Sequence, residues 1–215
     1  MIYDTGNEIK MRILLVRHGE TSWNVDGVRF RGQVDIGLSV FGQQQAEAVG
    51  RMLQEEAIEV IYHSPMVRTR QTAERIQQHQ GSSQLIEEPL LIDIDFGDWQ
   101  GQLHSEIFAA NPGTEEAWHK FPHELVFPNG ESWYRVYERI NLLFKRLRKQ
   151  ELDCVVLVTH GVVIRIILLY LLGLSPEHFW DFQIETCSLS EISLEPDGVF
   201  KIVKTNDTHH LSKNE

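Results

Sequence analysis

Three short runs of apolar residues divide the chain, and each run is followed by a polar turn or by a helix signal. They cover residues 12–16, 58–63 and 154–159. Apolar runs of this length that are rich in β-branched residues are typical of strands buried on both faces. The pattern therefore predicts the central strands of a parallel sheet.

Apolar residues at helical spacing fill the intervals between and after these strands. Ser39 is a suitable N-cap, and Ala46, Val49 and Met52 follow it every three or four positions, with Leu53 beside them. Such a stripe predicts an amphipathic helix. The same spacing predicts helices over residues 67–78, 132–149 and 162–172.

The fold class follows from the alternation of these elements and from the end of the chain. The stretch "SLSEISLEPDGVFKIVK" alternates around the turn "EPDG", which predicts a β-hairpin added late to the sheet. Strands that alternate with helices predict an α/β protein. We expect a three-layer sandwich with a mostly parallel central sheet and helices on both faces.

Residues 97–130 interrupt this rhythm. Pro112, Pro122 and Pro128 break the segment, and Trp99, Trp118, Phe121 and Phe127 lie along it. We interpret it as a partly helical, lid-like insertion in one domain that covers residues 1–215. Trp99 and Phe121 are the aromatic residues expected to form pocket walls.

The longest apolar stretch, "CVVLVTHGVVIRIILLYLLGL", has the length of a membrane span. It contains His160, Gly161 and Arg165, and a central arginine costs about 3 kcal/mol on insertion scales. The stretch is therefore interpreted as a buried strand, a polar turn and a buried helix.

Charge and cysteine content narrow the classes of partner and the compartment. The formal net charge of −11 disfavours nucleic acid and anionic membrane, because a polyanion is repelled over most of such a surface. Cys154 and Cys187 show no CxxC motif and no disulfide framework. With no secretory signal in the first residues, the prediction is a cytoplasmic protein with reduced thiols.

Basic residues follow the predicted strands where a parallel sheet forms its functional crevice. "RHGE" follows the first strand and "THGVVIR" follows a later one, so Arg17, His18 and His160 lie at strand ends. Arg68 lies about one turn into the helix that follows "YHSP". The sheet geometry thus directs four cationic or potentially cationic groups to one place.

Such a group of cations requires an anion, because it cannot be buried alone. A phosphoryl group suits it best, since its oxygens accept the planar forks of two arginines. A neutral imidazole nitrogen can also attack phosphorus and form a phosphohistidine. Arginines and a protonated histidine then stabilise the charge, so the chemistry needs neither metal nor other cofactor.

Six ordered stretches carry a family resemblance. They are "LLVRHGETSWN", "RFRGQVDIGLS", "YHSPMVRTRQTA", "DIDFGDWQG", "NGESWYRVYERI" and "LVTHGVVIR". Together they resemble the histidine phosphatase superfamily, which includes the cofactor-dependent phosphoglycerate mutases. The resemblance runs from about Arg12 to Leu211, so it implies a phosphoglycerate mutase-like fold for nearly the whole chain.

The resemblance also implies roles for individual residues. His18 is the nucleophile that becomes phosphorylated, and Arg17, Arg68 and His160 form the phosphate pocket with it. The implied contacts to the phosphoryl group or to the substrate are Asn24, Arg29, Thr21, Gly161 and Val162.

The general acid departs from the family pattern. The family places a Glu two residues before an apolar-acidic-"FG" sequence, and "LIDIDFGDWQG" places Asp93 there. An Asp can protonate a leaving alkoxide as a Glu does, although it is one methylene shorter. Asp93 is therefore the predicted acid, and its competitors are the neighbouring carboxylates Glu87, Glu88, Asp95 and Asp98.

The resulting hypothesis is a metal-independent phosphomonoester hydrolase that acts through a phosphohistidine on a small phosphorylated substrate. A plain amphipathic helix after "GES" favours it over the mutase, which is the first alternative. A non-catalytic phosphate-binding module is the second. A metal-dependent hydrolase is disfavoured because the sequence has no HExxH motif and Pro122 separates His119 from His123. The substrate and a homodimeric state stay open.

Overall fold

The computed structural model describes residues 9–24 and 27–211. Within these residues, six strands form one sheet: β1 Met11–Arg17, β2 Val60–His63, β3 Gln84–Glu87, β4 Cys154–Thr159, β5 Leu189–Leu194 and β6 Phe200–Asp207. The helices are α1 Val40–Met52, α2 Val67–Gln78, α3 His104–Ala110, α4 Thr114–Lys120, α5 Trp133–Leu147 and α6 Gly161–Leu172. Short 3₁₀ turns include Ser22–Asn24, Pro176–Asp181 and His209–Leu211.

The sheet is mostly parallel, as the apolar runs predict. Its strand order is β3-β2-β4-β1-β5-β6. The first four strands in this order run parallel, with Arg17 of β1 opposite Thr159 of β4. The hairpin of β5 and β6 adds to the edge by antiparallel pairing with β1. Of these six strands, only β3 was not predicted, because its four residues are exposed or half-buried and form no apolar run.

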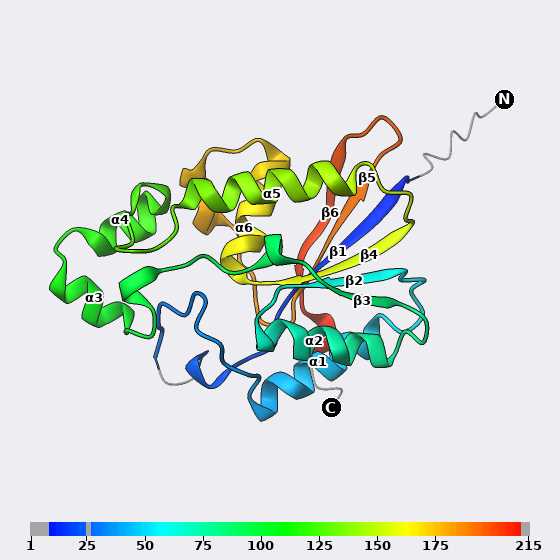
Figure 1. Ribbon diagram of the computed structural model, residues 1–215, viewed down its shortest axis with the longest axis horizontal. Helices are drawn as coiled ribbons and strands as arrows, with labels where there is room; N and C mark the ends of the chain where they lie inside the picture. Colours follow the sequence, from blue (N-terminus) through cyan, green and yellow to red (C-terminus); the bar gives the residue numbers. More distant parts are fainter. Residues whose placement is uncertain (1–8, 25–26, 212–215) are drawn as a thin grey trace.

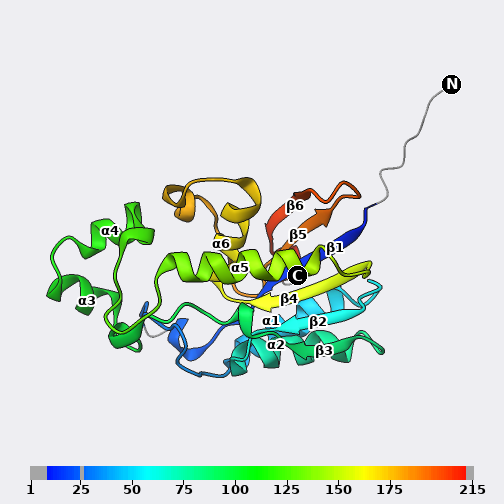
Figure 2. The ribbon, with the colours of Figure 1, turned by 45° about the horizontal axis from the view of Figure 1, so that its top comes forward.

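Helices cover both faces of the sheet, which confirms the three-layer sandwich. Figures 1 and 2 show α1 and α2 on one side and α5 and α6 on the other. Successive residues of β1 point to opposite layers: Leu14 packs in the core with α1 and α2, whereas Ile13 and Leu15 pack in the core with α5 and α6. This double burial explains why the strand reads as an unbroken apolar run.

The predicted helices and the predicted Ser39 cap agree with the structure. Ser39 caps α1 by accepting a hydrogen bond from the backbone of Gly42, and Ser132 caps α5 in the same way from Arg135. The long apolar stretch is β4, a turn at His160 and α6. No helix in the described part of the chain is long and apolar enough to cross a membrane.

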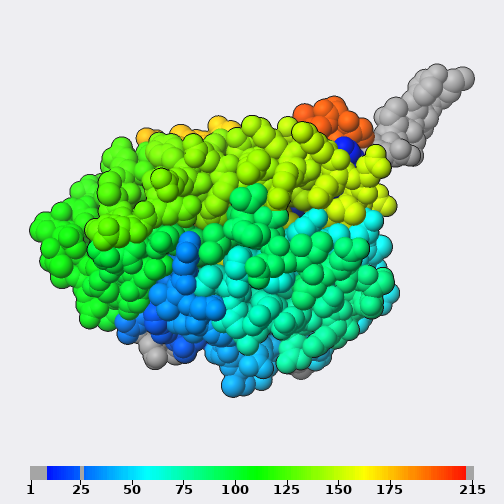
Figure 3. All heavy atoms as spheres, viewed as in Figure 1, coloured from blue at the N-terminus to red at the C-terminus, as the bar shows by residue number. Residues whose placement is uncertain are grey.

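The segment from residue 97 to residue 130 is partly helical and holds α3 and α4. It forms one end of the molecule, drawn in green in Figure 3. Trp118 anchors it, because the indole is buried against Phe30 and Trp180 at ring-centroid separations of 5.1 and 5.3 Å. The segment thus lies beside the carboxyl ends of the parallel strands; its action as a lid stays a prediction.

Candidate active site

The two predicted histidines meet at the carboxyl ends of neighbouring strands. His18 follows β1 and His160 follows β4, and the His18 backbone N–H donates to the Thr159 carbonyl at 2.9 Å. Their rings lie edge to face with centroids 5.3 Å apart. Both side chains are buried, with 1% of the surface exposed. The parallel pairing of β1 with β4 therefore creates the pair.

One hydrogen bond fixes the protonation of His18. Its Nδ1 lies 2.7 Å from the Gly19 carbonyl oxygen, which can only accept, so Nδ1 carries the proton. The other ring nitrogen, Nε2, then keeps its lone pair. Burial, followed by the positive charges of Arg68 and Arg31, holds the pKa of His18 well below its ordinary value. His18 is therefore a neutral imidazole with a free nucleophilic nitrogen.

Gly19 serves a close helix contact in addition to following the histidine. A Cβ at this position would lie 2.5 Å from the carbonyl oxygen of Gly42 in α1. In return, a Cβ at Gly42 would lie 2.0 Å from the Glu20 carbonyl oxygen. Paired glycines let the catalytic loop rest directly on α1.

Three guanidinium groups surround the histidines, one fully buried and two partly buried. Arg68 is completely buried and donates to the carbonyls of Gly32 (2.7 Å) and Val34 (3.0 Å), while Arg17 donates to Ile184 at 2.6 Å. Among the described residues, the buried Nε atoms of Arg17, Arg31 and Arg68 have no hydrogen-bond partner. Burial lowers the pKa of Arg31 to about 10. Buried donors of this kind form a site for an anion.

Asp93 lies inside this cationic group. Its Oδ2 is 3.3 Å from Arg68 and 3.5 Å from Nδ1 of His160, and its Oδ1 accepts the Ile94 backbone N–H. Burial raises the pKa of Asp93, and the Arg68 charge opposes that rise. The competing carboxylates Glu87, Glu88, Asp95 and Asp98 do not line the cavity described next.

A cavity of about 190 Å³ opens in front of these groups. Seven of the predicted site residues line it: Arg17, His18, Asn24, Arg29, Asp93, Gly161 and Val162. Arg68 and His160 are not lining residues, but both contact Asp93, which is one. Thr21 was predicted as a substrate contact, but it is buried and hydrogen-bonds Asn24 Oδ1 through both its N–H and its hydroxyl. Thr21 therefore contacts Asn24, which lines the cavity, and is not itself a lining residue.

The structure adds residues that the sequence analysis did not select. The cavity is also lined by two arginines, one histidine and three tryptophans: Arg31, Arg165, His104, Trp23, Trp118 and Trp180. Arg165 follows Gly161 by one helical turn, a spacing that could have identified it. The expected walls were wrong: Trp99 packs in the core against Phe30, and Phe121 lies 40% exposed outside the lining. Which aromatic residues of the segment 97–130 line the cavity depends on the tertiary fold of the segment and not on its composition.

Comparison with known proteins agrees with this geometry. The model of the histidine phosphatase superfamily (branch 1) matches residues 13–208. The chain belongs to this superfamily. Phosphoserine phosphatase 1 of Hydrogenobacter thermophilus is 36% identical over 204 residues, covering 94% of this chain and 95% of the relative. A metal-independent phosphoserine phosphatase of Arabidopsis thaliana is 34% identical and covers 93% and 83%.

Solved structures of the same fold extend this result. Bacillus stearothermophilus YhfR superposes with a TM-score of 0.87 at 28% identity over 94% of this chain and 100% of that one. The native mycobacterial glucosyl-3-phosphoglycerate phosphatase gives 0.82 at 27%, covering 92% and 99%. This histidine phosphatase superfamily member is thus an enzyme, a phosphomonoester hydrolase with the phosphoglycerate mutase-like fold.

Proposed function

We propose that hydrolysis runs through a phosphohistidine on Nε2 of His18. The observation that carries the proposal is the hydrogen bond from Nδ1 to Gly19, which leaves Nε2 unprotonated beside three arginines. In the first step Nε2 attacks phosphorus, and the bond from phosphorus to the ester oxygen breaks. The guanidiniums of Arg17 and Arg31, which line the cavity, stabilise the equatorial oxygens, and the nearby positive charge of Arg68 adds to this stabilisation.

Asp93 moves the proton in both steps of this proposal. It gives its proton to the departing alkoxide, so the alcohol leaves neutral. Water then attacks the phosphohistidine, Asp93 accepts a proton from that water, and the N–P bond returns its electron pair to Nε2. The burial that raises the pKa of Asp93 supports its protonated start.

No metal takes part in this sequence of steps. The positive charge that a metal would supply comes from guanidinium groups fixed by backbone carbonyls. The name of the Arabidopsis relative, a metal-independent phosphoserine phosphatase, supports the proposal that no metal is needed.

The substrate we propose is a small phosphomonoester with a second anionic group, and phosphoserine is the first candidate. Among the described residues, the cavity lining contains four arginines, Arg17, Arg29, Arg31 and Arg165, and one carboxyl group, Asp93. A phosphoryl dianion leaves at least one positive charge unpaired, and a carboxylate would pair with it. Two relatives with phosphoserine phosphatase names support this choice. We also propose a cytoplasmic location, which suits the two buried free cysteines.

One assay tests this proposal. A panel of phosphomonoesters, including phosphoserine, is hydrolysed in the presence of EDTA while phosphate release is measured. We expect turnover in EDTA and an acid-labile phosphoryl label that disappears in His18→Ala. A parallel reaction holds 3-phosphoglycerate with 2,3-bisphosphoglycerate. Rapid isomerisation there with little phosphate release would overturn the proposal in favour of a mutase.

A further inference from the structure

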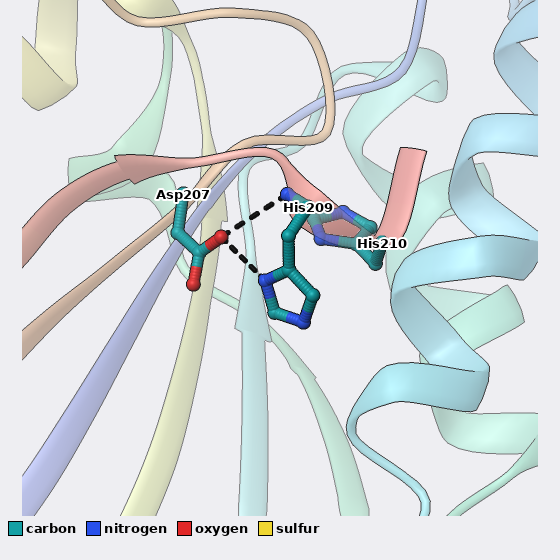
Figure 4. A group of neighbouring side chains, drawn as sticks. All are labelled: Asp207, His209 and His210. Carbon is teal, nitrogen blue, oxygen red and sulfur yellow. Dashed lines mark hydrogen bonds and ion pairs between the residues drawn. The ribbon is translucent and has the colours of Figure 1, made fainter. Parts of the chain in front are cut away.

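Two histidines and one aspartate gather where the last strand ends. Asp207 is the final residue of β6, and His209 and His210 begin the following 3₁₀ turn (Figure 4). One ligand atom from each residue lies within 4.8 Å of the other two. Two imidazoles and a carboxylate form a donor set typical of zinc. None of the three residues lines the active cavity.

His210 is oriented in the way that a metal ligand requires. Its Nε2 lies 2.9 Å from the Cys187 carbonyl oxygen, so Nε2 carries the proton and Nδ1 keeps the lone pair. Nδ1 is buried and has no partner among the described residues. Metal-binding histidines usually donate their other N–H to a carbonyl or carboxylate, which fixes the ring before the ion binds.

His209 and Asp207 already point toward one another (Figure 4). Nδ1 of His209 donates to Oδ1 of Asp207 at 2.6 Å, and the backbone N–H of His209 donates to the same oxygen. An ion bound by Nδ1 would replace the proton of the first of these bonds, which is released to solvent. The rings of His209 and His210 are perpendicular, with centroids 5.8 Å apart. Zinc bonds of about 2.0–2.2 Å let one ion join two imidazoles at such a separation after small side-chain movements.

We propose that Asp207, His209 and His210 bind a zinc-class divalent cation. Lys204 competes with the ion, because its ammonium lies 3.0 Å from Oδ2 of Asp207. The ion is structural in this proposal. His210 holds the Cys187 carbonyl, and the Cys187 N–H donates to the Arg17 carbonyl at 3.0 Å. The ion would therefore hold the 3₁₀ turn His209–Leu211 in place. Through Cys187, this turn supports the end of β1, where Arg17 lies and His18 follows.

Calorimetric titration of Zn²⁺ into EDTA-treated, dialysed protein tests the site. We expect one zinc per chain and at least a tenfold loss of affinity in His209→Ala and in His210→Ala. The matched control is His178→Ala, which removes an exposed histidine that also bonds a carboxylate, Asp181 at 2.8 Å. The control and His18→Ala should bind zinc unchanged. Absence of binding, or unchanged binding in both His209→Ala and His210→Ala, would overturn the site.

Two further variants keep the test decisive if a histidine variant misfolds. Asp207→Asn should weaken zinc binding, whereas Lys204→Met should strengthen it by removing the competing charge. A hundredfold excess of zinc over its Kd should raise the Tm of the native chain by roughly 5 °C or more. Equal effects of both variants on zinc affinity would contradict the proposal. Hydrolysis that persists in EDTA separates this site from the proposed catalytic steps.

Discussion

Ser64 and His160 are joined by a hydrogen bond of 2.8 Å between the serine hydroxyl and Nε2 of the histidine. Both residues are buried, and they follow the adjacent parallel strands β2 and β4. Oγ of Ser64 also lies 3.4 Å from the backbone N–H of Met66, which donates to it. The serine proton is therefore free to point at Nε2. Nδ1 of His160 then carries the ring proton and directs it toward Asp93, 3.5 Å away.

The first prediction tests this orientation with Ser64→Ala. Without the hydroxyl, the His160 ring loses the bond that holds its tautomer, so kcat should fall by about tenfold or more while KM changes little. The control is Ser83→Ala, which removes another buried serine hydroxyl, bonded to the Ile58 carbonyl at 2.6 Å. A pH profile of kcat that is identical for Ser64→Ala and the native enzyme would contradict the role.

Much of the site could be predicted because its residues follow strands whose apolar pattern is strong. Burial on both faces gives β1 and β4 continuous apolar runs, which are easily recognised in the sequence. Parallel pairing of these strands then brings His18 and His160 together. Arg68 was found by the same logic, and it is the second residue of α2. In each case a local pattern decides the position.

The remaining site residues depend on contacts between distant segments, which periodicity does not encode. Arg29 is the residue of "RFRG" predicted to contact the substrate, but Arg31 supplies the buried Nε beside the histidines. Arg29 lies over Trp23 and donates to the Gly101 carbonyl. Neither arginine lies in a helix or a strand, so no spacing rule separates them. Trp118 reaches the cavity through the fold of its own segment.

The second prediction concerns Asp93 and the pH profile. The proposed chemistry needs a neutral His18, whose pKa is lowered, and a protonated Asp93, whose pKa is raised. The rate should therefore fall as the pH drops through the His18 pKa and also as it rises through the Asp93 pKa. Asp93→Asn should remove the alkaline limb and lower kcat on phosphoserine by about 10²–10⁴.

Leaving-group dependence supplies the control for Asp93. Phenolic leaving groups need little protonation, so Asp93→Asn should affect p-nitrophenyl phosphate far less than phosphoserine. Asp93→Glu keeps the carboxyl group and should retain most of the activity. Near-full hydrolysis of phosphoserine by Asp93→Asn would show that another group is the acid.

The third prediction addresses the glycine contact beneath the catalytic loop. Gly19→Ala would place a methyl group 2.5 Å from a backbone oxygen of α1, and backbone yields less than a flexible side chain. We expect a loss of about 1–3 kcal/mol or more in the free energy of unfolding. Gly37→Ala is the control, because the three atoms nearest to its Cβ would all belong to the Gln71 side chain, at 3.2 to 3.8 Å. Equal urea midpoints for the two variants would refute the argument.

The last prediction separates the two anionic groups of the proposed substrate. Arg165 lines the cavity, stacks on Trp180 with its guanidinium carbon 4.9 Å from the ring centroid, and donates to the Phe182 carbonyl at 2.9 Å. Because these contacts hold the guanidinium at the Trp180 side of the cavity, it is suited to the second anion. Arg165→Gln should raise KM for phosphoserine by about tenfold or more and leave KM for p-nitrophenyl phosphate nearly unchanged.

Two comparison variants decide whether the effect of Arg165→Gln comes from charge. Arg165→Lys keeps the positive charge and should recover part of the affinity for phosphoserine. Arg70→Gln, at an arginine whose side chain is 53% exposed on α2, should change neither KM value. An equal rise of KM for both substrates in Arg165→Gln would place this arginine at the phosphoryl group, because only a contact that both substrates share can affect them alike.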